Sequence, residues 1–193
     1  MPAQPKHRGA IIEAAVALFR RKGYSGTGLA DIVERSGAPK GSLYHYFPKG
    51  KASIAEAAVA EASRRAAETL RALVDKHDTA GALFTAYAGQ MAEWMAKSGF
   101  QDGSPITTVL LEMAPKDEAV TRAGREGLAA RTAILRERLE ADGVPTERAS
   151  RLAELASAAL EGALVQARIA ESQAPILNIA EEMSRQFAAA TKA

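Results

Sequence analysis

The chain has 193 residues, 47% of them hydrophobic and 25% charged, which is enough apolar side chain to bury a core and enough charge to keep the chain in solution. The absence of cysteine excludes disulfides, thiolate metal sites and cysteine nucleophiles, and it is typical of a reducing, cytoplasmic setting. The net charge of +2 is unevenly spread, because residues 1–51 hold nine lysines and arginines against three acids, or +6, and the rest sums to −4. A basic end on an acidic chain indicates either a polyanion partner for that end or a solvated basic face.

The composition favours helices over strands, since alanine and leucine are frequent and aromatic residues make up only 5%. No apolar run approaches the roughly 20 residues of a membrane span, and the first ten residues lack the apolar core of a signal peptide. The expected helices are, in chain order, 6–22, a short one capped by Thr27, a second short one from Pro39 to about Phe47, 51–76, 79–97, 105–113, 117–141, 146–171 and 175 onward. With no strand-like alternation and no repeat, we predict an all-α fold of about nine helices.

Residues 27–47, TGLADIVERSGAPKGSLYHYF, have the helix-turn-helix pattern of a short helix, a turn that contains glycine and a second short helix. The major groove of DNA admits one such helix, provided that the first helix braces it. The side chains expected to bury together are Leu29, Ile32, Leu43 and Phe47, against Val16 and Phe19. The residues left to face DNA are Lys40, Ser42, Tyr44 and His45, while Gly41 lets the backbone approach the duplex closely. Tyr46 is expected in the core or at its rim.

The run from Leu29 to Lys51 resembles the DNA-binding domain of the TetR family of regulators, as does the preceding helix that ends in FRRKGY. The resemblance covers roughly residues 6–56 and implies a DNA-binding domain over 1–50 followed by a ligand-binding and dimerisation domain over 51–193. It implies phosphate contacts at Thr27 and Lys51 and major-groove positions for Lys40, Gly41, Ser42, Tyr44 and His45. Two departures stand out: Gly28 replaces the usual Ser or Thr, and PKG lengthens the spacing before Lys51, as in the LmrA/YxaF-like branch.

Large apolar side chains gather in the middle of the chain and indicate either a core stripe or a pocket for a flat or bulky apolar ligand. The candidate pocket residues are Phe84, Tyr87, Met91, Trp94, Ile106, Val109, Leu110 and Met113. Residues 99–112, GFQDGSPITTVLLE, also resemble the LmrA/YxaF-like branch, with serine at position 104 where that branch usually has cysteine. In the wider family this helix touches both the ligand and the helix that carries the DNA-reading domain. Glu112 is a polar anchor for the ligand or a solvated acid.

The last two expected helices carry apolar and small residues at helical spacing, which form either plain core or a surface for a symmetric copy. The candidate interface residues are Leu152, Leu155, Ala159, Ala163, Ile176, Ile179 and Met183. The family resemblance implies a four-helix dimer interface in this region. Dimerisation also follows from the DNA side, because one short recognition helix reads too few base pairs to specify a genomic site.

No catalytic constellation is present: the sequence lacks HExxH, GxSxG, P-loop and GxGxxG motifs, and its three histidines are scattered. We therefore expect no enzyme, no metal and no cofactor. The sequence predicts a homodimeric, ligand-responsive repressor that binds an inverted-repeat operator in double-stranded DNA and is released by a small apolar or aromatic effector. An activator with the same fold and a helical interaction module without DNA binding are the alternatives. The operator, the effector and the regulated genes do not follow from the sequence.

Overall fold

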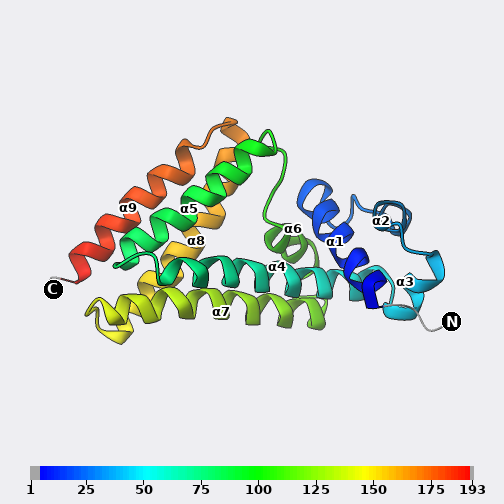
Figure 1. The fold of residues 1–193 in the computed structure, drawn as a ribbon, viewed down its shortest axis with the longest axis horizontal. Helices are drawn as coiled ribbons and strands as arrows, with labels where there is room; N and C mark the ends of the chain where they lie inside the picture. The colour runs from blue at the N-terminus through cyan, green and yellow to red at the C-terminus, as the bar shows by residue number, and fades with distance from the viewer. Residues whose placement is uncertain (1–4, 192–193) are drawn as a thin grey trace. The chain divides into compact units, whose positions relative to one another are not determined.

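The computed structural model describes residues 5–191, and every regular element in that range is an α-helix (Figure 1). The helices are α1 (Pro5–Lys22), α2 (Leu29–Ser36), α3 (Lys40–Tyr46), α4 (Lys51–Val74), α5 (Ala80–Lys97), α6 (Pro105–Met113), α7 (Glu118–Ala141), α8 (Thr146–Ala170) and α9 (Ala174–Ala190). This order confirms the prediction of an all-α chain that begins with three helices, of which the second and third are short.

Local chemistry explains where these helices begin and end. The Thr79 side chain accepts a hydrogen bond from the Ala82 amide at the start of α5, and Ser104 does the same for Thr107 at the start of α6. The cap of α2 differs from the prediction, because Gly28 rather than Thr27 occupies the N-cap position. The Gly28 amide donates to the Asp31 carboxylate at 2.9 Å, so the side chain of the third helical residue does the capping.

The contacts divide the chain into two compact units, each with its own core. The first unit contains the residues up to Arg64 together with Ser104–Gly127, and the second contains Arg65–Gly103 together with the residues from Leu128 onward. Helices α4 and α7 each supply residues to both units. This division differs from a boundary near residue 50, because α6 and the first part of α7 pack with the N-terminal helices.

The core of the first unit joins α1, α2 and α3 to the first half of α4 and to α6. Its largest fully buried side chains are Ile11, Phe19, Ile32, Leu43, Ile54 and Val59. Val109 of α6 and Val120 of α7 are buried in the same cluster. The helix-turn-helix segment therefore rests on apolar contacts with its own unit.

The core of the second unit lies among α5, α8 and α9, with α4 and α7 contributing their later residues. The rings of Phe84 on α5 and Phe187 on α9 meet edge to face, with centroids 5.9 Å apart. Leu139, Leu152 and Ile176 are almost fully buried beside them. This unit is thus a helical bundle with a mainly apolar interior.

The turn between α2 and α3 depends on glycine at position 37. Gly37 has φ 62° and ψ 11°, and its amide donates to the carbonyls of Val33 and Glu34 at the end of α2. This left-handed conformation is strained for any residue with a Cβ atom. The glycine therefore sets the angle at which the chain enters α3.

We predict that Gly37→Ala lowers the free energy of unfolding by about 1 kcal/mol, because the left-handed backbone penalises the added Cβ atom. Gly41→Ala is the matched control: a Cβ atom meets open space at both positions, but Gly41 lies within helix α3. The control is expected to be neutral or stabilising by roughly 0.5 kcal/mol. Urea denaturation of the two variants measures the difference, and equal effects of the two substitutions would contradict the argument.

Candidate nucleic-acid interface

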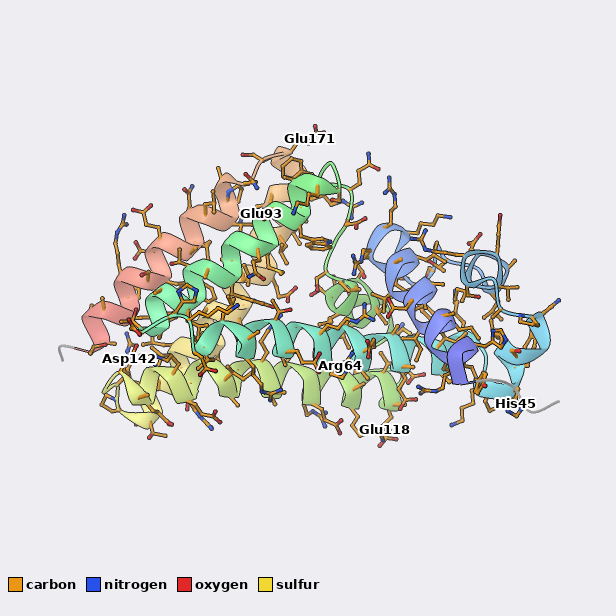
Figure 2. All side chains as sticks on the ribbon, viewed as in Figure 1. His45, Arg64, Glu93, Glu118, Asp142 and Glu171 are labelled. Carbon is orange, nitrogen blue, oxygen red and sulfur yellow. The ribbon has the colours of Figure 1, made fainter. Side chains whose placement is uncertain are left out.

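Helix α3 turns one side into the core and the other toward solvent. Leu43 is buried, whereas Lys40, Gly41, Tyr44 and His45 are exposed and Ser42 is half-buried. The structure thus brings together on one seven-residue helix all five residues that the sequence predicted for the major groove. Figure 2 labels His45 among these side chains. The exposed set offers an ammonium, a phenol hydroxyl and an imidazole to a partner, and the half-buried Ser42 adds a second hydroxyl.

The outward side of α3 is held by the buried side. Leu43 and Phe47 pack with Phe19 of α1 and Ile32 of α2, all of them nearly inaccessible to solvent. The Arg8 guanidinium lies 5.7 Å from the centroid of the Phe47 ring. Tyr46 is half-buried against the same core, and its ring meets the His45 ring edge to face at 5.0 Å. The first helix of the motif therefore braces the second, as the sequence predicted, although Leu29 is only partly buried.

Thr27 does not present its side chain to solvent. The residue is 0% exposed, and its hydroxyl donates to the carbonyl of Gly23 at 2.8 Å. The hydroxyl predicted to hold a phosphate is thus used inside the turn between α1 and α2. The sequence pattern did not reveal this placement, because a threonine before a helix is far more often a solvent-facing cap.

Lys51 opens α4 and reaches back to the same turn. Its ammonium donates to the carbonyls of Tyr24 at 3.0 Å and Thr27 at 2.9 Å, and it lies 4.2 Å from the centroid of the Tyr24 ring. An ammonium has three N–H donors, so these two bonds leave one donor for a phosphate. The family resemblance implies a phosphate contact for Lys51. Only the one N–H donor that the turn does not use is left for it.

The residues predicted to bind a ligand fall into two separate cores. Phe84, Tyr87, Met91 and Trp94 belong to the second unit, where the first two are buried and the last two are half-buried. Those on α6 belong to the first unit: Ile106, Val109, Leu110 and Met113. A sequence pattern gives the apolar face of each helix but not the core that the face joins.

The second unit contains a narrow cavity of about 10 Å³, roughly the room of one water molecule, and its lining includes only two of the predicted ligand residues. Phe84 and Tyr87 line it together with apolar groups from α4, α7 and α8, among them Leu70. The polar residues of the lining besides Tyr87 are Arg131, Thr132 and Ser157, and the sequence did not predict Arg131 at this site. A charged residue in helical register with buried Leu135 was the signal for it.

The Arg131 side chain is buried, with 8% of the residue exposed, and its charge is paired inside the unit. Its guanidinium donates to the Glu161 carboxylate at 2.8 Å and to the Ser157 hydroxyl at 2.8 Å. Burial raises the pKa of the Tyr87 hydroxyl, although the neighbouring Arg131 lowers it in part, so this hydroxyl remains protonated at neutral pH. The cavity therefore combines apolar walls with a polar cluster in which the charges are already paired.

The residues predicted for a dimer interface do not share one surface. Leu152, Ala163, Ile176 and Met183 are buried in the core of the chain itself, so they do not form a face for a second copy. Ala159 and Ile179 are half-buried, and only Leu155 is well exposed. Both sides of α8 are rich in alanine and leucine, which is why the pattern did not distinguish the inner side from the outer one.

Other kinds of site find no support in the described residues. Between residues 5 and 191, no cluster of three or more histidines and acids is placed to hold a metal ion. Across the same range, no helix combines the length and the apolar content that a bilayer crossing requires.

Comparison with known proteins gives matches over both parts of the chain. The family profile of bacterial regulatory proteins of the TetR family matches residues 11–58, and that of the LmrA/YxaF-like transcriptional regulator C-terminal domain matches residues 80–182. The HTH-type transcriptional regulator LmrA of Bacillus subtilis is 30% identical over 176 residues, which cover 89% of this chain and 92% of LmrA.

Solved structures share the fold. The regulatory protein TetR from Rhodobacter sphaeroides superimposes with a TM-score of 0.79 at 25% identity, over 92% of this chain and 96% of that chain. The TetR family regulator CifR, a cysteine mutant in complex with 26-bp double-strand operator DNA, superimposes with a TM-score of 0.76 at 24% identity, over 92% and 94% of the two chains.

We predict that Thr27→Val lowers the free energy of unfolding by about 1 kcal/mol, because valine keeps the shape but removes the donor to the Gly23 carbonyl. Thr85→Val, which makes the same change at an exposed position of α5, is expected to have a smaller effect. Thermal denaturation of both variants checks this order. Full stability of Thr27→Val would show that the hydroxyl is not needed inside the turn.

Proposed function

The chain belongs to the TetR family of bacterial transcriptional regulators, and from that premise we propose that it is a ligand-responsive repressor that binds an inverted-repeat operator as a homodimer. The observation that carries the proposal is the division of α3 into a buried side and an exposed side. Leu43 anchors the helix, while Lys40, Tyr44 and His45 project from it. Side chains on a rigid helix can enter a major groove and contact base edges.

The charge distribution supports a duplex as the partner. Residues 1–51 carry +6, and the rest of the chain carries −4. Such a basic end attracts the phosphate backbone and positions the reading helix over the groove. CifR, which has the same fold, has been solved on operator DNA. A homodimer would place two copies of α3 about 34–36 Å apart, in successive major grooves of an inverted repeat.

One face of α8 supports a symmetric interface. Leu155, Ala158, Gly162, Val165 and Ile169 recur every three or four residues on that helix, and all are exposed in the single chain. Leu177 on α9 is exposed as well. Alanine and glycine allow two helices to approach closely, and exposed leucine, valine and isoleucine side chains gain from burial against a copy. We assign the dimer interface to this outer face of α8.

The cavity of the second unit supports a small apolar or aromatic effector. Phe84, Tyr87 and Leu70 offer rings and methyl groups, while the nearby Arg131 is already paired with Glu161. The cavity has room for about one water molecule, so an effector enters only if these side chains move apart. A mainly apolar molecule suits the lining best, because a new charge would remain unpaired. Such an effector releases DNA only to the extent that it binds the DNA-free conformation more tightly than the DNA-bound one.

We predict that Lys40→Gln weakens binding to a duplex selected from a random-sequence pool and reduces the dependence of affinity on salt. Loss of one positive charge at the duplex surface lowers the slope of log affinity against log salt by up to about 0.9. Lys76→Gln is the matched control, because Lys76 is equally an exposed lysine but lies in the second unit. Fluorescence anisotropy between 50 and 200 mM salt gives both slopes, and identical slopes for wild type and Lys40→Gln would oppose the proposal.

We predict that Ile169→Glu converts the dimer into a folded monomer, because the new carboxylate would be buried without a partner in the interface. Leu111→Glu is the control: Leu111 and Ile169 are each 79% exposed, but Leu111 lies on α6 in the first unit. Analytical ultracentrifugation reports the mass of each variant, and circular dichroism reports its folding. If Ile169→Glu sediments as wild type does, the interface lies elsewhere.

A further inference from the structure

We propose that Glu112 of α6 is a positioning residue for DNA binding, because it holds the turn between α1 and α2 that leads into the helix-turn-helix. The inference rests on the proposed function, since it concerns how well the DNA-reading helices are placed for a duplex. Glu112 is exposed, as expected of a solvated acid, but both oxygens of its carboxylate are engaged by backbone.

The carboxylate accepts hydrogen bonds from two successive backbone amides of the turn. One oxygen accepts from the Tyr24 amide at 2.8 Å and the other from the Ser25 amide at 2.8 Å. Partial burial raises the pKa of Glu112, but hydrogen bonds from Ser25 and Tyr24 and the charge of Lys51 outweigh that effect and hold it below the ordinary value. The group therefore remains a carboxylate at neutral pH, and its charge strengthens both bonds.

Gly23 makes this approach possible. Its φ of +73° lies in the left-handed region, and a Cβ atom there would stand 2.6 Å from the nearer Glu112 oxygen. A side chain at position 23 would thus strain the backbone and displace the carboxylate. The sequence accordingly combines a glycine in the turn with an acid 89 residues later on α6.

The turn is held from both sides by opposite charges. Glu112 accepts from its amides, while the Lys51 ammonium donates to the carbonyls of Tyr24 and Thr27. A second α6 side chain, Thr108, lies one helical turn before Glu112. Its single O–H is shared between the Phe19 carbonyl near the end of α1, at 3.1 Å, and the Ser104 carbonyl of its own helix, at 3.0 Å. Helix α6 therefore contacts the end of α1 and the start of the turn through one of its faces.

The consequence for DNA binding follows from the chain order. The turn ends at Gly28, the N-cap of α2, and α2 braces the recognition helix. Loosening the turn lets the end of α2 move, so part of the binding free energy is then spent on ordering it. A looser turn lowers the fraction of molecules that are ready to bind and weakens the apparent affinity by that fraction.

The sign of the effect separates positioning from simple electrostatics. Glu112→Gln removes a negative charge from the basic unit, so long-range attraction alone would strengthen DNA binding. A positioning role predicts the opposite, a loss of about tenfold in affinity, because the amide cannot accept both backbone N–H groups. Glu118→Gln is the matched control, since it removes the same charge from an exposed site in the same unit. Its affinity is expected to equal or exceed that of wild type.

The experiment measures affinity for a selected duplex by anisotropy, at a temperature where circular dichroism shows each variant folded. Amide hydrogen exchange of Tyr24 and Ser25 is followed in parallel. We expect weaker binding and faster exchange at both amides in Glu112→Gln. Gly23→Ala keeps the Glu112 charge but displaces the carboxylate, so it should lose affinity in the same direction even if Glu112→Gln fails to fold.

Unchanged or stronger binding in folded Glu112→Gln, or unprotected Tyr24 and Ser25 amides in wild type, would overturn the inference. Failure of the wild-type chain to bind any duplex would instead remove the proposed function on which the inference rests. The two failures are therefore distinguishable in one set of measurements.

Discussion

The burial of Leu43 and Phe47 against Phe19 is the contact on which the DNA-reading unit depends. Helix α3 has seven residues, and isolated helices shorter than about 12 residues are marginal in water. The helix therefore exists because its inner side joins a core made by α1, α2 and α4. The same contact fixes the orientation of its outer side, so the exposed side chains are presented together in one arrangement.

Polar contacts hold the rest of the DNA-reading unit in place. The turn between α1 and α2 has its own internal bond from Thr27, a lysine on its carbonyls and a glutamate on its amides. These side chains come from α4 and α6, which are distant in sequence from the turn. The family profile that matches residues 11–58 thus covers the reading helices but not the α6 residue that supports them.

Much of the fold follows from local signals in the sequence. Helices α5 and α6 begin within one residue of the expected positions, where Thr79 and Ser104 cap them, and Gly37 ends α2. The inner and outer sides of α3 also follow, because a short amphipathic helix has only one way to bury its two large apolar residues. In α8, by contrast, both sides are apolar, and the sequence placed the buried Leu152 and the exposed Leu155 in one interface.

What the sequence did not reveal are contacts between polar groups that lie far apart along the chain. Glu112 and the turn are separated by 87 or more residues, and Arg131 pairs with Glu161 across two helices. Helical periodicity gives the face of a helix on which a charge lies, but not its partner. Such pairs become visible only when the packing of the helices is known.

The absence of cysteine allows the central claim, that the outer side of α3 meets a duplex, to be tested directly. Tyr44→Cys provides a single attachment point for an iron chelate that cleaves nearby DNA, and Lys76→Cys provides the same tag in the second unit. On a selected duplex, the account predicts two cuts from the Tyr44 position, symmetric about the centre of the site and about 10 bp apart, or a multiple of that spacing. Cleavage that is absent, or that matches the pattern from position 76, would contradict it.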